Sequence, residues 1–331
     1  CGPGIELGAM TARVAAGARL HFGFQNLSLA HDRLYGGVGA TLDQPRLVLE
    51  ASVDDQIVCD GADATAYVEA AVRALDVPGA SVTVAESLPR HVGLGSGTRL
   101  ALASLVAVAG AYDRTVDVRE MAPKLGRGGR SGVGIATFDS GGFVLDAGHP
   151  TERFTTDAPA DGEWTAPPVA ARHDIPESWR FLLVTPAVER GRSGTPEDNS
   201  IRSVVERADP GIADEIAQVV VRQLLPGIAT DDHGTFGRAV ARLGRLNGAW
   251  YADEQGGVYR PPAGEVVDAL DSVPGVSGAG QSSWGPTVYG VTHADVAESA
   301  AEAARDALDS AGIEGTVRVA RPCNEGARVE E

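Results

Sequence analysis

The sequence predicts an α+β protein built from two domains. Its 331 residues exceed the usual size of one compact core, and 43% of them are hydrophobic, which is enough for two cores. Segments that alternate apolar and polar residues, as half-buried strands do, are interspersed with segments of helical spacing. Residues 147–178 show no period and are rich in Pro, Asp, Thr and Ala, so we expect the domain boundary there. We therefore predict an N-terminal domain over 10–160 and a C-terminal domain over 161–321.

The N-terminal half is predicted to hold strands on both sides of a helical pair. We expect strands over 12–24, 46–53 and 80–89, and helices over 62–75, 100–112 and 117–125. The first of these stretches has the apolar spacing of a helix, whereas the second is almost unbroken in its apolar residues, which indicates burial. The glycine-rich segment 126–146 predicts two short strands joined by glycine turns.

The C-terminal half is predicted to be a small sandwich of helices on a sheet. We expect a strand over 179–186, four helical stretches between 198 and 272, a glycine-serine loop over 277–285, a helix over 294–311 and a strand over 315–320. The last ten residues, 322–331, are expected to form a loose tail.

Charge is strongly unbalanced in this chain. Acidic residues number 45 against 28 basic ones, for a net charge of −17, and Lys124 is the one lysine among the basic residues. Such an acidic surface is typical of proteins from a high-salt cytoplasm, with compositional drift as the alternative. It argues against binding to nucleic acid and to anionic membranes. The three cysteines have no metal-like spacing, which fits a reducing compartment, so we expect a cytoplasmic protein.

The N-terminus carries no pattern of a secretory signal. The longest apolar stretch, 100–112, is too short to cross a bilayer. Residues 1–9 precede the first patterned segment, so we take them as a cloning remnant or an upstream extension. A lipid-modified Cys1 is the alternative.

Three glycines stand directly before the buried helix, in "PRHVGLGSGT" at 89–98. Backbone amides at the start of a helix have no partner within the helix, and the helix dipole adds partial positive charge there. Because glycines leave these amides accessible, the segment predicts a phosphate-binding loop. The contributing residues are Gly93, Leu94, Gly95, Ser96, Gly97, Thr98 and Arg99. The alternative is an ordinary tight turn, and the spacing matches neither a Walker loop nor a dinucleotide fingerprint.

Three motifs in the same order resemble those of the GHMP superfamily of small-molecule kinases. The segment 89–98 resembles the superfamily's phosphate loop, 126–142 its middle motif, and 277–291 its C-terminal glycine-rich loop. The resemblance implies the two-domain GHMP-kinase fold, with an N-terminal domain like ribosomal protein S5 and a C-terminal ferredoxin-like α/β sandwich. It also implies an active site between the two domains.

The sequence departs from the superfamily's kinases at two places. Gly134 stands where many of these kinases have an aspartate that polarises the hydroxyl to be phosphorylated, and a glycine cannot move a proton. Asp139 is the candidate for a displaced substitute. The C-terminal loop has Gln281, Ser282, Ser283 and Trp284 in place of a run of glycines. These side chains suit a small polar substrate that has an aromatic part.

One branch of the superfamily resembles this sequence in these departures as well, the beta-ribofuranosylaminobenzene 5'-phosphate synthases. The segments that carry the closer resemblance are 18–24, 35–43, 91–103, 126–149 and 278–290. The resemblance implies an enzyme that joins 5-phosphoribosyl 1-pyrophosphate to 4-aminobenzoate or 4-hydroxybenzoate, with release of CO2 and pyrophosphate, at the start of methanopterin-type cofactor synthesis. Two alternatives stay open: an ATP-dependent small-molecule kinase, and a phosphometabolite-binding protein without catalysis.

The resemblance also suggests roles for individual residues. At the reacting centre we place Arg130, Ser131 and Asp139. Arg127 is expected to bind a phosphate or the aryl carboxylate. For substrate binding we expect Arg19, His21, Arg190, Arg192, Gln281, Ser282, Ser283 and Trp284. Mg²⁺ is the implied cofactor, with Ser96 and Thr98 as its nearest ligands. The alternatives are solvated arginines, a structural His21 and a core Trp284, and the oligomeric state stays open, although a homodimer is common among relatives.

Overall fold

The computed structural model describes residues 11–61, 63–154, 160, 162–188 and 195–330. The strands are β1 Thr11–Asn26, β2 Arg33–Val53, β3 Ile57–Asp60, β4 Ala80–Glu86, β5 Phe143–Asp146, β6 His149–Pro150, β7 Val169–His173, β8 Trp179–Pro186, β9 Gly278–Gln281, β10 Val288–His293, β11 Gly315–Ala320 and β12 Arg328–Glu330. The α-helices are α1 Thr65–Leu75, α2 Ser96–Ala111, α3 Val118–Met121, α4 Val133–Asp139, α5 Thr195–Arg207, α6 Pro210–Val219, α7 Leu225–Ala229, α8 His233–Gln255, α9 Ala263–Asp271 and α10 Ala297–Ala311. Within this part of the chain, no helix is long and apolar enough to cross a membrane.

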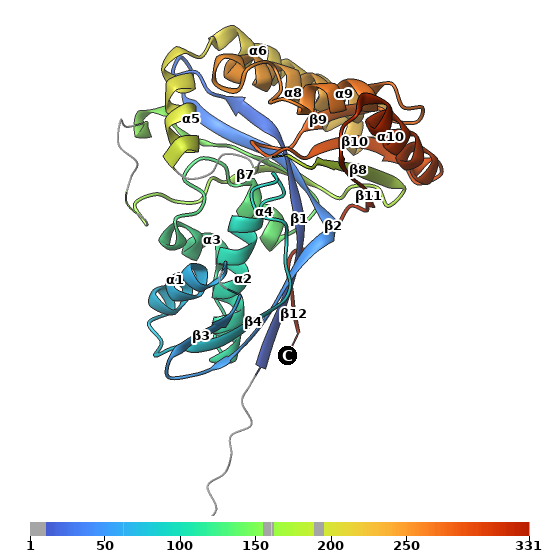
Figure 1. Ribbon diagram of the computed structural model, residues 1–331. Helices are drawn as coiled ribbons and strands as arrows, with labels where there is room; N and C mark the ends of the chain where they lie inside the picture. The colour runs from blue at the N-terminus through green and yellow to red at the C-terminus, as the bar shows by residue number, and fades with distance from the viewer. Residues whose placement is uncertain (1–10, 62, 155–159, 161, 189–194, 331) are drawn as a thin grey trace, which may run out of the picture.

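Two antiparallel strands, β1 and β2, connect the lower and upper parts of the molecule (Figure 1). Their sheet has the order β12-β1-β2-β4-β3, and β5 and β6 also pair with β2. The β1–β2 register shifts between Gly17 and Arg19 and again between His21 and Gly23. Bulges of this kind bend a strand and change the direction of its side chains. The two irregularities flank Arg19 and His21, which places both side chains at the bend between the two parts of the fold.

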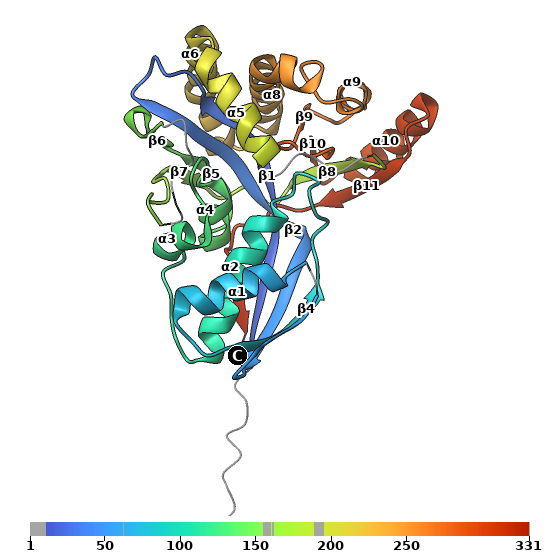
Figure 2. The same ribbon diagram turned by 60° about the vertical axis from the view of Figure 1, so that its left-hand side comes forward.

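The second sheet has the order β11-β8-β10-β9 and is antiparallel throughout. Helices α8, α9 and α10 cover it, as both views show (Figures 1 and 2). Aliphatic side chains of β8, such as Leu182 and Val184, pack on buried residues of α9 and α10, such as Val266 and Ala301. This arrangement confirms the predicted sandwich of helices on a sheet.

Helix α2 lies between the first sheet and helix α1 (Figure 2). Twelve of its 16 residues are buried, which confirms the expectation from its apolar sequence. Because the helix is enclosed on all sides, its first turn is fixed in place. The glycine segment before it therefore meets a rigid helix end.

The two parts of the fold share an apolar contact around Phe22 of β1. Its ring lies 5.0 Å from Tyr289, 5.9 Å from Phe236 and 6.4 Å from Phe181, measured between ring centroids. The first sheet also includes β7 and β12, which follow residue 160 in the chain. The first sheet is therefore built from segments of both halves of the sequence, whereas all strands of the second sheet follow residue 178.

Three local predictions are wrong. Residues 126–146 do not form two strands, because 133–139 fold as helix α4 and only β5 follows. Ser131 accepts a hydrogen bond from the amide of Val133 at the start of this helix. The C-terminal residues do not form a loose tail, since β12 pairs with β1 and the amide of Ala327 bonds to the carbonyl of Phe138. The loop over 277–285 begins with strand β9, because Gly278 to Gln281 pair with β10.

Candidate active site

The glycine segment ends in an uncapped helix terminus. Gly95 precedes α2 with a φ of 78°, Gly93 has a φ of 95°, and the N-cap position offers no side chain to accept a hydrogen bond from the first turn of the helix. Both angles lie in the region that glycine adopts without steric cost. The first-turn amides, at Ser96 to Thr98, therefore remain available to an anion. The geometry fits the predicted phosphate loop.

Arginines lie against this loop on two sides. A Cβ placed on Gly95 would lie 3.3 Å from Arg19 Nε, and one on Gly97 would lie 3.7 Å from Arg127 Nη1. Arg127 also stacks on Tyr67, with its Cζ 5.4 Å from the ring centroid, and Arg90 lies 5.5 Å from the same centroid. The Nε of Arg127 is buried and has no hydrogen-bond partner among the described residues. Arg90 was not predicted, although it is adjacent to the loop in the sequence.

Arg99 does not face the loop, which corrects its predicted role. It is 1% exposed, and its guanidinium donates to Gly17 O, Gly134 O and Thr137 Oγ1 at 2.8, 2.7 and 3.1 Å. Burial, with a contribution from the charge of Arg19, lowers its pKa to about 9. These three acceptors connect α2 to β1 and α4, so Arg99 stabilises the core below the loop.

The C-terminal loop is joined to the glycine loop through backbone contacts. Ser282 Oγ donates to Gly93 O at 2.8 Å and accepts from the amide of His21 at 3.1 Å. The amide of Ser283 bonds to His21 O at 3.2 Å. Gln281 is buried and bonds to the backbone of Arg260 and Gly285. Ser282 and Gln281 therefore connect the loops around the site, and Gln281 also lines the aromatic pocket next to it. Their expected contacts with substrate stay predictions.

An aromatic pocket opens beside His21, between β1, α8 and the C-terminal loop. Its walls include Phe22, Phe24, Tyr251, Tyr259 and Trp284, and the exposed Ser283 lies at its edge. Trp284 packs edge to face on Tyr251 with 4.7 Å between ring centroids. The hydroxyl of Tyr259 is buried and has no hydrogen-bond partner within the described part of the chain. Burial raises the pKa of Tyr259 to about 12, so this hydroxyl is a neutral donor.

His21 is connected to a buried carboxylate by a serine. His21 Nε2 lies 3.2 Å from Ser131 Oγ, and Ser131 Oγ lies 3.3 Å from Asp146 Oδ2. Burial, with a smaller effect of Arg19, lowers the pKa of His21 well below its usual value. Burial raises the pKa of Asp146, and hydrogen bonds from Gly148, Gly37, Gly132 and Ser131 oppose this rise. Asp146 was not predicted, although an aspartate that directly follows an apolar strand was a visible signal.

The remaining predicted residues are Arg130, Asp139, Arg190 and Arg192, and not all of them are placed near this site. Arg130 is close to Tyr35, since its charge acts on the pKa of that phenol, which burial raises. Asp139 is exposed at the far end of α4 from Ser131, about 9 Å along the helix axis, so the structure does not bring it to the reacting centre. Arg190 and Arg192 lie outside the described residues.

The comparisons with known proteins agree with this geometry. Residues 64–142 match the family described as GHMP kinases N terminal domain, and residues 224–310 match GHMP kinases C terminal. The beta-ribofuranosylphenol 5'-phosphate synthase of Methanothermobacter thermautotrophicus is 33% identical over 293 residues, which cover 83% of this chain and 87% of that protein. The protein of the same name from Archaeoglobus fulgidus is 30% identical over 323 residues, 96% of this chain and 99% of that one.

The chain belongs to the beta-ribofuranosylphenol 5'-phosphate synthase family. This family is a branch of the GHMP superfamily and consists of enzymes of the pentosyltransferase type. The fold agrees, since mevalonate diphosphate decarboxylase from Staphylococcus aureus superposes with a TM-score of 0.66 over 97% of this chain and 98% of that one, at 11% identity.

Gly134 shows how this member of the family differs from the kinase pattern. A Cβ on Gly134 would lie 3.0 Å from Thr98 Cγ2, which is closer than ordinary contact. The absent side chain thus lets α4 approach the first turn of α2. An aspartate at this position would require Thr98 to move.

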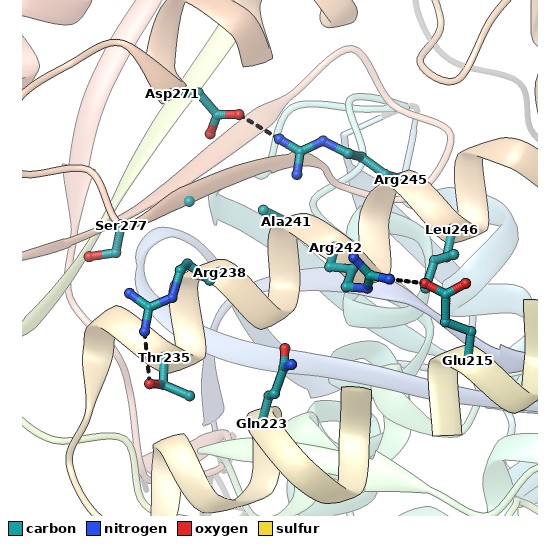
Figure 3. A pocket seen from close by; sticks show the side chains of 11 residues that line it. Glu215, Gln223, Thr235, Arg238, Ala241, Arg242, Arg245, Leu246, Asp271 and Ser277 are labelled. Atoms are coloured by element: carbon teal, nitrogen blue, oxygen red, sulfur yellow. Dashed lines mark hydrogen bonds and ion pairs between the residues drawn. The ribbon is translucent and has the colours of Figure 1, made fainter. Parts of the chain in front are cut away.

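A separate groove lies along α8 (Figure 3). Arg238, Arg242 and Arg245 line it, and they bond to Thr235, Glu215 and Asp271, respectively. The groove shares no lining residue with the aromatic pocket. Since two of its three arginines are neutralised by carboxylates, we do not assign substrate binding to it.

Proposed function

We propose that the protein transfers the phosphoribosyl group of 5-phosphoribosyl 1-pyrophosphate to the ring carbon of a 4-substituted benzoate, with loss of CO2 and pyrophosphate. One observation carries the proposal: His21 lines an aromatic pocket, and Ser282 joins its backbone to the glycine loop, where Arg19 and Arg127 flank an uncapped helix terminus. The relatives are named for a phenol product, beta-ribofuranosylphenol 5'-phosphate, which favours 4-hydroxybenzoate over 4-aminobenzoate as the aryl acid. By the resemblance, this product would begin a methanopterin-type cofactor.

The glycine loop would bind the diphosphate. As the bond from the anomeric carbon to pyrophosphate breaks, the sugar gains positive character and the leaving group gains charge. Amides of residues 96–98, together with Arg19 and Arg127, stabilise that charge without having to reorganise. The ring carbon that bears the carboxylate forms the new bond, and loss of CO2 restores aromaticity. The step balances without a proton acceptor, which agrees with glycine at position 134.

A magnesium ion would be held mainly by the substrate. The described residues contain no group of three or more His, Cys, Asp or Glu side chains that could bind a metal. The donors near the loop are the hydroxyls of Ser96 and Thr98, and Mg²⁺ commonly takes one or two protein ligands while phosphate oxygens and water complete its shell. The residues present therefore fit a substrate-borne ion, which would supply charge neutralisation of the diphosphate.

The aromatic pocket would hold the aryl acid. Its free volume of about 60 Å³ in this structure is smaller than that of a cavity that holds benzene, so we expect the pocket to widen when an aryl ring binds. The donor hydroxyl of Tyr259 supplies a polar contact within it. A change in Trp284 fluorescence on addition of 4-hydroxybenzoate, absent in Trp284→Phe, would report this movement.

The decisive experiment is one incubation with phosphoribosyl pyrophosphate, Mg²⁺ and either aryl acid, followed by assay of CO2 and pyrophosphate in equal amounts. Tyr259→Phe should raise KM for the aryl acid more than for the diphosphate. ATP consumption with a small alcohol would instead support a kinase. Stabilisation by ligands without any turnover would support a binding protein.

A further inference from the structure

The carboxylate of Asp146 is enclosed by donors. Its side chain is 0% exposed and accepts from the amide of Gly132 at 2.7 Å, the amide of Gly148 at 2.8 Å and Ser131 Oγ at 3.3 Å. The backbone of Gly37 also bonds to it. The three backbone N–H groups can only donate, whereas a hydroxyl such as Ser131 Oγ can donate or accept. Three obligate donors on two oxygens favour the ionised form of Asp146 and oppose the rise in its pKa that burial causes.

An ionised Asp146 fixes the direction of the next hydrogen bond. The hydroxyl of Ser131 has one proton, and it must donate this proton to the carboxylate. Ser131 Oγ then acts only as an acceptor toward its other neighbours, the amide of Val133 and His21 Nε2, each 3.2 Å away. His21 Nε2 must accordingly carry a hydrogen.

His21 has one ring proton to place. Its side chain is 5% exposed, and the adjacent charge of Arg19 disfavours a second proton. With the hydrogen on Nε2, Nδ1 carries a lone pair. Nδ1 has no hydrogen-bond partner among the described residues, and the ring lines the aromatic pocket.

We propose that Asp146 and Ser131 are positioning residues that fix His21 as the Nε2–H tautomer, so that Nδ1 accepts a hydrogen bond from an O–H or N–H group of the substrate. His21 then selects a neutral donor and does not bind a carboxylate or a phosphate. The identity of the substrate rests on the proposed function. The donor is either the 4-hydroxyl or 4-amino group of the aryl acid or a hydroxyl of the ribose.

A contact with the ring substituent would also assist the reaction. Acceptance of a hydrogen bond from a 4-hydroxyl group raises electron density at the opposite ring carbon, which bears the carboxylate. That carbon is the nucleophile of the proposed step. The hydroxyl of Tyr259 lies in the same pocket and would donate a hydrogen bond to the substrate. His21 would be the group in this pocket that accepts one.

Nitrogen NMR of ¹⁵N-histidine-labelled protein tests the tautomer without any turnover. The His21 signals are identified by their loss in His21→Gln. We expect the neutral Nε2–H pattern at pH 7 in the wild type, and a population of the Nδ1–H tautomer in Ser131→Ala. Ser140→Ala, a matched control at the opposite end of α4 that removes a hydroxyl bonded to Ala136 O, should leave the pattern unchanged. An imidazolium or an Nδ1–H ring in the wild type would overturn the proposal.

Ligand additions then identify the donor. We expect the Nδ1 resonance to shift with 4-hydroxybenzoate but not with benzoate if the ring hydroxyl is the donor, and with ribose 5-phosphate if the sugar is. Equal shifts with benzoate and 4-hydroxybenzoate, or no shift at saturation with any of these ligands, would refute the contact. Absence of binding together with absence of CO2 release would contradict the proposed function, while the tautomer measurement would still decide the role of Asp146 and Ser131.

Kinetics provide a second readout of positioning. Ser131→Ala should raise KM for the substrate that carries the donor at least tenfold, with a smaller change in KM for the other substrate. A variant that lost only stability would not separate the two KM values. Asp146→Asn is less informative alone, because an amide group would face a backbone N–H and the protein would lose stability.

Discussion

Ser282 Oγ donates to the carbonyl of Gly93 over 2.8 Å, although 189 positions separate the two residues in the chain. The same oxygen accepts from the amide of His21. One buried hydroxyl thus joins the phosphate loop, the C-terminal loop and the first strand, so the proposed site depends on contacts between the two ends of the chain.

Ser282→Ala should destabilise the protein and weaken binding at the loop. The substitution leaves the Gly93 carbonyl and the His21 amide without a partner, at a cost of about 1–3 kcal/mol for each unsatisfied group. We expect a lower Tm and a higher KM for phosphoribosyl pyrophosphate. Ser310→Ala, which removes an exposed hydroxyl bonded to Asp306 O, is the control. Equal Tm values for the two variants would contradict the structural role of Ser282.

Gly93→Ala should lower the free energy of unfolding by more than backbone strain alone would. A Cβ at Gly93 would lie 2.1 Å from the carbonyl oxygen of Ser282, whereas one at Gly256 would have nothing within 4 Å. Both residues have positive φ, 95° and 83°, so Gly256→Ala measures the strain, on the order of 1–2 kcal/mol. We expect urea denaturation to show a clearly larger loss for Gly93→Ala, together with loss of diphosphate binding by calorimetry. Similar losses of stability in both variants would show that the loops do not pack as described.

Gly134→Asp should not create a kinase. The new Cβ would lie 3.0 Å from Thr98 Cγ2, and the added carboxylate would repel a phosphate at the first turn of α2. We expect a loss of about 1–3 kcal/mol in the free energy of unfolding and a loss of phosphoribosyl transfer. An assay of ATP consumption with small alcohols should remain at background. Gly134→Ala, which adds the Cβ without the charge, should show a smaller loss of transfer.

Stability should decrease in a His21-dependent way as the pH falls below 6.5. The pKa of His21 is lowered in the folded protein, so the unfolded chain binds the proton more strongly. The contribution of neutral His21 to the free energy of unfolding is complete above pH 6.5. It is lost as the pH falls from 6.5 toward the folded-state pKa, by up to about 1.4 kcal/mol per pH unit. Denaturation of the wild type and His21→Gln between pH 5 and 7.5 should therefore give different slopes. Parallel curves would contradict a neutral buried His21.

Salt should stabilise the protein over an unusually wide range. With a net charge of −17, the folded chain is subject to self-repulsion that added cations reduce. Screening of ordinary surface charge is largely complete near 0.15 M, where the Debye length is about 8 Å. We expect Tm to keep rising up to about 2 M KCl if the acidic surface is an adaptation to high salt. A plateau below 0.5 M would favour compositional drift.

Much of the fold could be predicted because it depends on local pattern. Alternation predicted β1 and the second half of β2, and apolar content predicted a buried α2. The prediction of two strands over 126–146 was wrong because the glycines there suggested turns. Packing of Ile135 and Phe138 in the core stabilises a helix instead. The prediction of a loose C-terminal tail was wrong because β12 pairs with β1, a contact between segments distant in sequence.

The glycines and hydroxyls of the phosphate loop follow from the sequence by itself, because an uncapped helix start is a local feature. The same holds for the acidic surface and for the absence of an aspartate at position 134. Only the tertiary structure decided the different roles of Arg99 and Arg127. Arg99 is buried among backbone carbonyls, whereas Arg127 faces the loop. Tertiary structure also joined Asp146 to His21 through Ser131, because burial and contacts distant in sequence bring the three side chains together and spacing along the chain does not encode them.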